Sequence, residues 1–111
     1  MANLQPKRFY TGYATASNVY TAPSDIGSYS IVRSIHACNA VATDKIFSIN
    51  LIPQFGSAGK DNLIMSNITV PGDDVVVSDT TIVLGPGESL YLTQSTADIV
   101  LTISGVEYNS A

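Results

Sequence analysis

Residues 80–107 have the sequence TTIVLGPGESLYLTQSTADIVLTISGVE, which predicts three β-strands joined by two turns. The first turn is marked by GPG at residues 85–87, because glycine tolerates positive φ while proline fixes φ at about −65°. Apolar and polar residues then alternate in SLYLTQ, residues 89–94, and again in IVLTIS, residues 99–104. A strand with one apolar face must pack that face against something, so this stretch predicts one side of a layered β-structure.

The rest of the chain repeats this pattern at intervals of roughly ten residues. Ile, Val and Thr make up 31 of the 111 residues, which favours strands, and no window of helical period exceeds a turn or two. The prediction is an all-β fold, an antiparallel β-sandwich that is jelly-roll-like and has about eight strands. Outside the first stretch, the predicted strands lie at residues 8–15, 18–22, 29–39, 45–53, 62–70 and 75–77.

The predicted organisation is a single β-sandwich domain at residues 8–111, preceded by an extended N-terminal arm at residues 1–7. The arm is polar, and Pro6 disfavours regular strand pairing there. The continuous apolar run at residues 75–77 predicts a strand that is covered on both faces. Strand alternation predicts a core made of Ile31, Ile35, Phe47, Ile49, Leu51, Leu90, Leu92, Ile99, Leu101 and Ile103.

The composition is unusually poor in charge for so small a chain. Charged residues make up 13% of the sequence, whereas about 25% is usual. Two interpretations remain open: a surface rich in Ser, Thr and Asn, or a surface partly buried against other subunits. The second interpretation predicts an oligomer.

Charge is also distributed unevenly along the chain. All five Lys and Arg residues lie in the first sixty positions, and residues 61–111 carry seven acidic residues and no basic one. If this asymmetry is also spatial, it suits docking between copies. The net charge of −4 argues against nucleic acid as a partner. The segment MANLQPKRFY lacks the apolar core of a signal peptide and no apolar run is long enough to span a membrane, so we expect synthesis in a host cytoplasm and no membrane partner.

His36 and Cys38 are the chain's only histidine and cysteine, and strand alternation places them on the same side of one strand. A zinc site needs about four ligands, and a Cys–His nucleophilic pair needs side chains that point at each other. Neither requirement is met, so the pair is expected to be buried and inert.

Acidic residues in the predicted turns offer little chemistry either. Their spacing matches no known Ca²⁺ loop, and aspartate is common in turns for local hydrogen-bonding reasons. No catalytic, metal or cofactor site is predicted, and the protein is not expected to be an enzyme. The acidic residues considered are Asp73, Asp74, Asp79, Glu88 and Asp98.

Four aromatic residues cluster near the N-terminus and follow two basic residues. One interpretation is an edge strand whose rings cover the core, and another is a contact surface, because tyrosine is favoured in interfaces. A carbohydrate-binding platform is a third interpretation, although tryptophan is absent. The candidate interface consists of Lys7, Arg8, Phe9, Tyr10, Tyr13 and Tyr20.

Several segments, taken in order, resemble a known family. The succession NVYTAPS, SIVRSIHACNA, AGKDNLI, TVPGDD, TIVLGPGESLYL and TISGVE is similar to small structural proteins of tailed bacteriophages. The resemblance covers residues 18–107, and residues 1–17 lie outside it. Each piece is mostly strand and turn chemistry, so the resemblance depends on their order. Glu88 stands where the family commonly has aspartate.

This resemblance implies a virion component: a trimeric β-sandwich that decorates or cements the capsid shell. Its partners would be the major capsid protein or other virion proteins, and its location would be the virion. Similar domains occur in the neck, tail and baseplate, so those places stay open. An alternative of another class is a carbohydrate-binding receptor module, in which Tyr13 and Tyr20 would contact the sugar.

Overall fold

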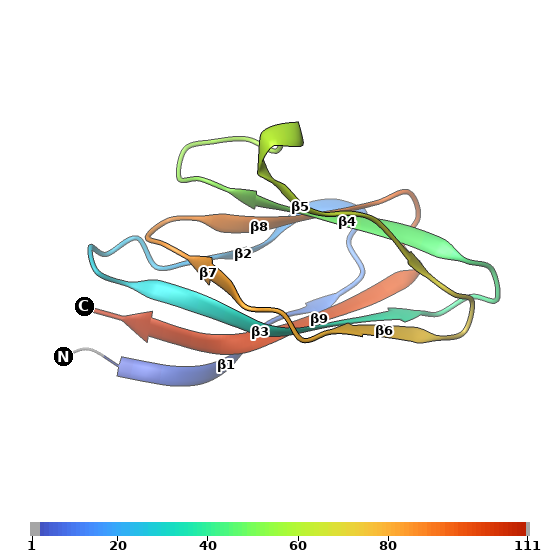
Figure 1. Ribbon diagram of the computed structural model, residues 1–111, viewed down its shortest axis with the longest axis horizontal. Helices are drawn as coiled ribbons and strands as arrows, with labels where there is room; N and C mark the ends of the chain where they lie inside the picture. Colours follow the sequence, from blue (N-terminus) through green and yellow to red (C-terminus); the bar gives the residue numbers. More distant parts are fainter. Residues whose placement is uncertain (1–2, 111) are drawn as a thin grey trace.

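The computed structural model describes residues 3–110 (Figure 1). Over this range the chain forms nine β-strands and one short 3-10 helix, η1 (Lys60–Asn62). The β6 and β7 strands pair one after the other along β3, so they share the place of one strand in the predicted set of about eight. The strands are β1 (Asn3–Gly12), β2 (Ala16–Thr21), β3 (Tyr29–Asn39), β4 (Lys45–Ile52), β5 (Leu63–Val70), β6 (Val75–Ser78), β7 (Ile82–Leu84), β8 (Ser89–Gln94) and β9 (Ile99–Asn109).

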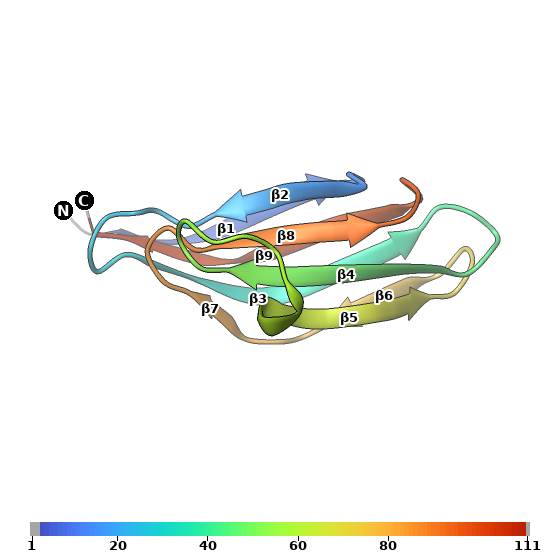
Figure 2. The same cartoon turned by 90° about the horizontal axis from the view of Figure 1, so that it is seen from above.

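The strands form two antiparallel sheets that pack face to face, which confirms the predicted all-β sandwich (Figures 1 and 2). The five-stranded sheet has the order β1-β9-β3-β6, with β7 also paired to β3, and the four-stranded sheet has the order β2-β8-β4-β5. When β6 and β7 are counted as one strand, consecutive strands lie in opposite sheets except for the β4–β5 hairpin, and both sheet orders are those of a jelly roll. The prediction of a jelly-roll-like fold is therefore confirmed.

The core lies between the two sheets and is made by the inward faces of their strands. Eight of the ten predicted core residues are buried. Leu51 is half-buried and packs against the core, whereas Ile31 faces away from it. The stretch of residues 80–107 supplies Leu84, Leu90, Leu92 and three buried residues of β9, as its alternation predicts.

A β-bulge in β3 explains why Ile31 is misplaced by simple alternation. The register of β3 against β9 shifts between Val32 and Ser34, so the extra residue Arg33 changes the side to which neighbouring residues point. Before the bulge Ser30 and Val32 are buried, and after it the odd-numbered residues from Ile35 onward are buried. The prediction of Ile31 as a core residue was therefore wrong.

The structure also corrects the expectation of an extended N-terminal arm outside the sheets. Residues 3–7 belong to β1, which pairs with β9 from Asn3 opposite Asn109 to Gly12 opposite Leu101. Pro6 lies opposite Val106 and is tolerated because β1 is an edge strand with one side unpaired. Residues 1 and 2 of the expected arm lie outside the described range.

Three buried amide side chains hold the loops to the sandwich. Asn39 donates from Nδ2 to the carbonyl oxygens of Thr43 (2.7 Å) and Val70 (3.1 Å), and its Oδ1 accepts from the Val41 amide (3.0 Å). Gln94 spans the β8–β9 turn in a similar way, and Asn50 donates to the loop before η1. These contacts satisfy buried polar atoms that would otherwise be costly to desolvate.

Candidate interaction surface

The aromatic residues of the predicted interface mostly belong to the core. Phe9 is 9% exposed, and its ring stacks on the Tyr20 ring with 4.2 Å between centroids. Tyr10 packs against the same cluster, and its hydroxyl accepts a hydrogen bond from the Ala14 amide (3.3 Å). At these three residues the rings cover the core, which agrees with the first of the three interpretations.

Tyr20 and Lys7 meet at Glu107, which joins the two sheets. The Tyr20 hydroxyl donates to Oε2 of Glu107 at 2.5 Å and lies 2.7 Å from Oγ of Ser30. Lys7 forms an ion pair with Oε1 of the same carboxylate at 3.2 Å. Burial raises the pKa of Tyr20 well above its ordinary value, and the hydrogen bond to Glu107 adds to this rise. One face of the Tyr20 ring is therefore taken up by Phe9 and its hydroxyl by Glu107, and its contact with a sugar stays a prediction.

The two remaining residues of the predicted interface, Arg8 and Tyr13, are exposed, but one lies within a strand and the other in a loop. Tyr13 is 61% exposed and sits in the link between β1 and β2. Arg8 is exposed on β1, opposite Ser104 of β9. The structure therefore does not gather the six predicted residues into one surface, and their contact with a partner stays a prediction.

A different surface emerges on the side of the five-stranded sheet that faces away from the core, here called the outer face. Strand register places Pro6, Val106, Ile31 and Val83 side by side across β1, β9, β3 and β7. Val83 is 56% exposed. These four residues form an apolar row, although outward positions of a solvated sheet are usually polar.

Aromatic rings extend this apolar row at the end of the sheet where β1 begins. Tyr29 of β3 and Tyr108 of β9 are direct neighbours, and their rings stack with 4.9 Å between centroids. Leu4 of β1 lies opposite Tyr108 and is 62% exposed. Stacked aromatic rings beside exposed aliphatic groups are typical of protein interfaces.

The other end of the outer face is apolar as well, and it contains His36 and Cys38. Cys38 lies between Val75 of β6 and Val100 of β9 in the register. Both His36 and Cys38 are exposed, so the expectation that they are buried was wrong. The expectation that residues 75–77 are covered on both faces was also wrong, because Val75 and Val77 are each nearly half exposed.

Two arginines occupy the middle of the outer face. Arg8 of β1 and Arg33 of the β3 bulge flank Ser104 of β9. The strands that carry them are separated by β9, so the two backbones lie about 10 Å apart. Neither arginine forms an ion pair within residues 3–110, and no outward position of the five strands holds Asp or Glu. Asp79 lies in the link between β6 and β7, which passes Arg33 in the strand register, but it forms no ion pair with it.

Comparison with known proteins gives a structural likeness only. No protein-family model and no curated protein sequence matches the chain. A chain in the structure of the infectious bursal disease virus Gx strain is similar, with a TM-score of 0.52 and 15% identity over 96% of this chain. A chain in the crystal structure of the infectious bursal disease virus VP2 subviral particle aligns with a TM-score of 0.28 and 15% identity. The match spans 31% of the first chain and 41% of the second, and the first likeness shows a shared fold.

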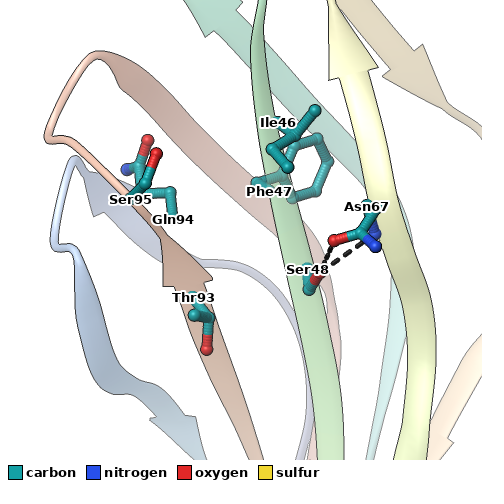
Figure 3. Close-up of a pocket in the computed structure, with 7 residues that line it drawn as sticks. All are labelled: Ile46, Phe47, Ser48, Asn67, Thr93, Gln94 and Ser95. Carbon is teal, nitrogen blue, oxygen red and sulfur yellow. Dashed lines mark hydrogen bonds between the residues drawn. The ribbon is translucent and has the colours of Figure 1, made fainter.

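The opposite side of the molecule carries a shallow pocket of about 250 Å³ (Figure 3). It forms where β5 bulges away from β4: Asn67 adopts a positive φ of 49°, and its amide donates to Oγ of Ser48 at 2.9 Å. No charged side chain lines the pocket, and its surface is mainly apolar. The lining residues are Ile46, Phe47, Ser48, Asn67, Thr93, Gln94 and Ser95.

Two further features bear on function. Within residues 3–110, no three His, Cys, Asp or Glu side chains gather closely enough to hold a metal ion. The described chain also contains no helix that is both long and apolar enough to cross a membrane. The outer face, by contrast, is apolar at both ends and cationic in the middle.

Proposed function

We propose that the protein is a structural component of a bacteriophage virion that decorates and cements the capsid shell. The observation that carries this proposal is the outer face, where apolar side chains and two arginines without a carboxylate partner replace the usual polar surface. Exposed apolar patches of this kind mark interaction sites on soluble proteins. The resemblance of residues 18–107 to phage structural proteins supports the virion. The shared fold with a chain of a virus structure supports it as well.

In this proposal the domain acts by binding and performs no reaction. The outer face lies against neighbouring coat subunits, and because it binds only the assembled shell, binding stabilises that assembly by mass action. At a free concentration of about 100 times Kd, each bound site would add about 2.7 kcal/mol. Assembly of the copies as trimers, which the resemblance implies, is part of the same proposal.

The sole cysteine of the chain offers a direct test, because Cys38 lies on the outer face and is exposed. Purified protein is bound to virions from which the native copies have been stripped, and alkylation of Cys38 is followed by mass spectrometry. We expect the alkylation rate to fall at least about tenfold on binding, since buried interface groups exclude water and reagent.

The matched control is the double variant Cys38→Ser/Phe55→Cys, which moves the thiol to a loop residue that is 97% exposed and lies off the outer face. Its alkylation rate should be the same with and without virions. Equal reactivity of Cys38 in the free and bound protein would contradict the proposed face. Absence of the protein from purified virions would overturn the proposed function itself.

Copy number separates the shell from a tail, neck or baseplate location. Quantification against the major coat protein should give on the order of hundreds of copies per virion for a shell protein, as repeated symmetric sites require. On the order of a dozen copies would place the protein in the tail, neck or baseplate instead.

A further inference from the structure

We infer that the partner surface bound by the outer face presents exposed carboxylates set among apolar side chains, and that Arg8 and Arg33 bind those carboxylates. This inference rests on the proposed function, since it specifies the chemistry of the coat-protein surface that the face would contact.

First, within residues 3–110, Arg8 and Arg33 lack the carboxylate partners that two of the lysines have. Those two lysines are already paired: Lys7 lies 3.2 Å from Glu107, and Lys45 lies 3.4 Å from Asp98. Arg8 and Arg33 have none within the described residues, and they stand on a face whose outward positions are free of acid. A guanidinium binds a carboxylate through two parallel hydrogen bonds, which makes a carboxylate the best-matched partner for each.

Second, apolar side chains lie on both sides of the two arginines. Leu4, Tyr108 and Val83 lie on one side of the arginines, and Val75 and Val77 lie on the other. Covering these groups removes water from around the central charges, and an ion pair in such a low-dielectric setting is stronger than one at an exposed surface. The partner surface should therefore present apolar side chains around its carboxylates.

The size of the face is sufficient for a stable contact. The two sheets stack along the intermediate axis of the molecule, as Figures 1 and 2 show, so the face measures at most 47 by 19 Å, or about 900 Å². Standard protein–protein interfaces bury about 800 Å² on each partner. Nearly the whole outer face would be used.

A face-to-face pair of this chain fits the pattern poorly. A two-fold contact would place the central arginines of one copy over those of the other, and like charges at an interface are unfavourable. Asp44, Asp73 and Asp74, which form no ion pair within residues 3–110, lie in loops at one end of the sandwich and not on this face. We therefore assign the face to a second protein, the coat, and treat self-association as an outcome to be measured.

The experiment measures binding of the full-length protein to stripped virions by co-sedimentation. The variants are Arg8→Glu, Arg33→Glu and the double reversal, with Lys60→Glu in η1 as a charge-matched control off the face. We expect about tenfold weaker binding or more for each arginine reversal and no change for the control. Arg33→Gln, which keeps the bulge and removes only the charge, should weaken binding less than Arg33→Glu.

Chemistry on the partner provides the second arm. Amidating the exposed carboxylates of the virion with carbodiimide and methylamine should abolish binding, because the guanidiniums then lose their acceptors. Raising NaCl from 50 to 500 mM should weaken binding of the wild type more than that of the double reversal, since salt screens the charge pairs. Thermal unfolding of each variant shows that it is folded.

The outcomes separate this inference from the proposed function. If the wild type binds and the double reversal binds equally well, or if amidated virions still bind, the inference is overturned while the decoration role stands. If the wild type does not bind virions at all, the proposed function fails. If the arginine variants instead abolish self-association in the absence of virions, the face belongs to a second copy and the assignment to the coat is wrong. Binding to nucleic acid in place of virions would also overturn it.

Discussion

At the scale of single residues, Tyr20 is the clearest example of a side chain that looks available in sequence and is occupied in the fold. Its hydroxyl is shared between Glu107 and Ser30, and its ring lies against Phe9. Tyr20 thus links β2 of one sheet to β9 and β3 of the other. Removing that link should affect stability before it affects any interaction.

The raised pKa of Tyr20 predicts alkaline sensitivity. The unfolded chain loses the phenol proton near the ordinary pKa of 10.0, whereas the folded chain keeps it because the buried hydroxyl stays neutral. The stabilisation is therefore complete below that pH and is lost as pH rises toward the folded-state pKa. The loss should be smaller than the limiting value of about 1.4 kcal/mol per pH unit, because solvent partly screens the ring.

Urea unfolding of the wild type and of Tyr20→Phe between neutral pH and pH about 11 provides the measurement. The free energy of unfolding of the wild type should fall more steeply with pH than that of the variant, in which the other titrating groups are unchanged. Parallel pH profiles would show that the hydroxyl ionises as easily in the folded state as in the unfolded one.

Replacing Asn39 should destabilise the fold strongly, although its side chain is polar. Asn39→Ala removes two donated hydrogen bonds and one accepted bond at a site that is 2% exposed. We expect a loss of about 2–3 kcal/mol, because buried backbone groups such as the Val70 carbonyl lose their partner. Gln5→Ala, which truncates an exposed amide on β1, should change the free energy of unfolding by less than about 0.5 kcal/mol. If chemical denaturation gave the same change in the free energy of unfolding for Asn39→Ala and Gln5→Ala, Asn39 would not hold the loops to the sandwich as described.

At the scale of elements, alternation predicted strands well wherever one face of the strand is buried. The bounds expected for β3 were confirmed, and those of β4 and β5 differ by one residue. Alternation failed at bulges, because the extra residue at Arg33 depends on how β3 pairs with β9 and leaves no local signal. It also failed at edges, where Pro6 is tolerated only because no strand lies beyond β1.

The β3–β9 contact predicts that Gly105 cannot be replaced. Gly105 lies opposite Val32, and a Cβ atom there would overlap the carbonyl oxygen of Ile31. Because backbone rather than a mobile side chain blocks the space, Gly105→Ala should cost about 3 kcal/mol or more. Gly59→Ala is the matched control: its backbone is extended (φ −161°), and the new methyl would meet only the end of the Asp61 side chain.

Thermal or chemical denaturation of the two glycine variants gives the comparison. A loss for Gly105→Ala no larger than that for Gly59→Ala, expected to be below about 1 kcal/mol, would mean that β3 and β9 can move apart at no great cost.

At the scale of the whole molecule, the fold could be predicted from the sequence, but the candidate surface could not. The outer face depends on register across four strands, which brings Val83, Arg33 and Arg8 together from distant segments. Only Arg8 was among the predicted interface residues. One signal was present: the run at residues 75–77 is apolar at successive positions, which predicted cover on both faces. In the isolated domain only one face is covered, and the proposed partner would cover the other.

The ends of the chain have a practical consequence for the assembled particle. Because Asn3 lies opposite Asn109, both described ends emerge together at one end of the sandwich (Figure 1). A cargo fused to either end would stand beside Leu4 and Tyr108, far from Val75 and Val77. Linker length would thus decide whether a displayed cargo competes with the shell for the aromatic part of the face. A cargo fused to either end should therefore be joined through a long linker.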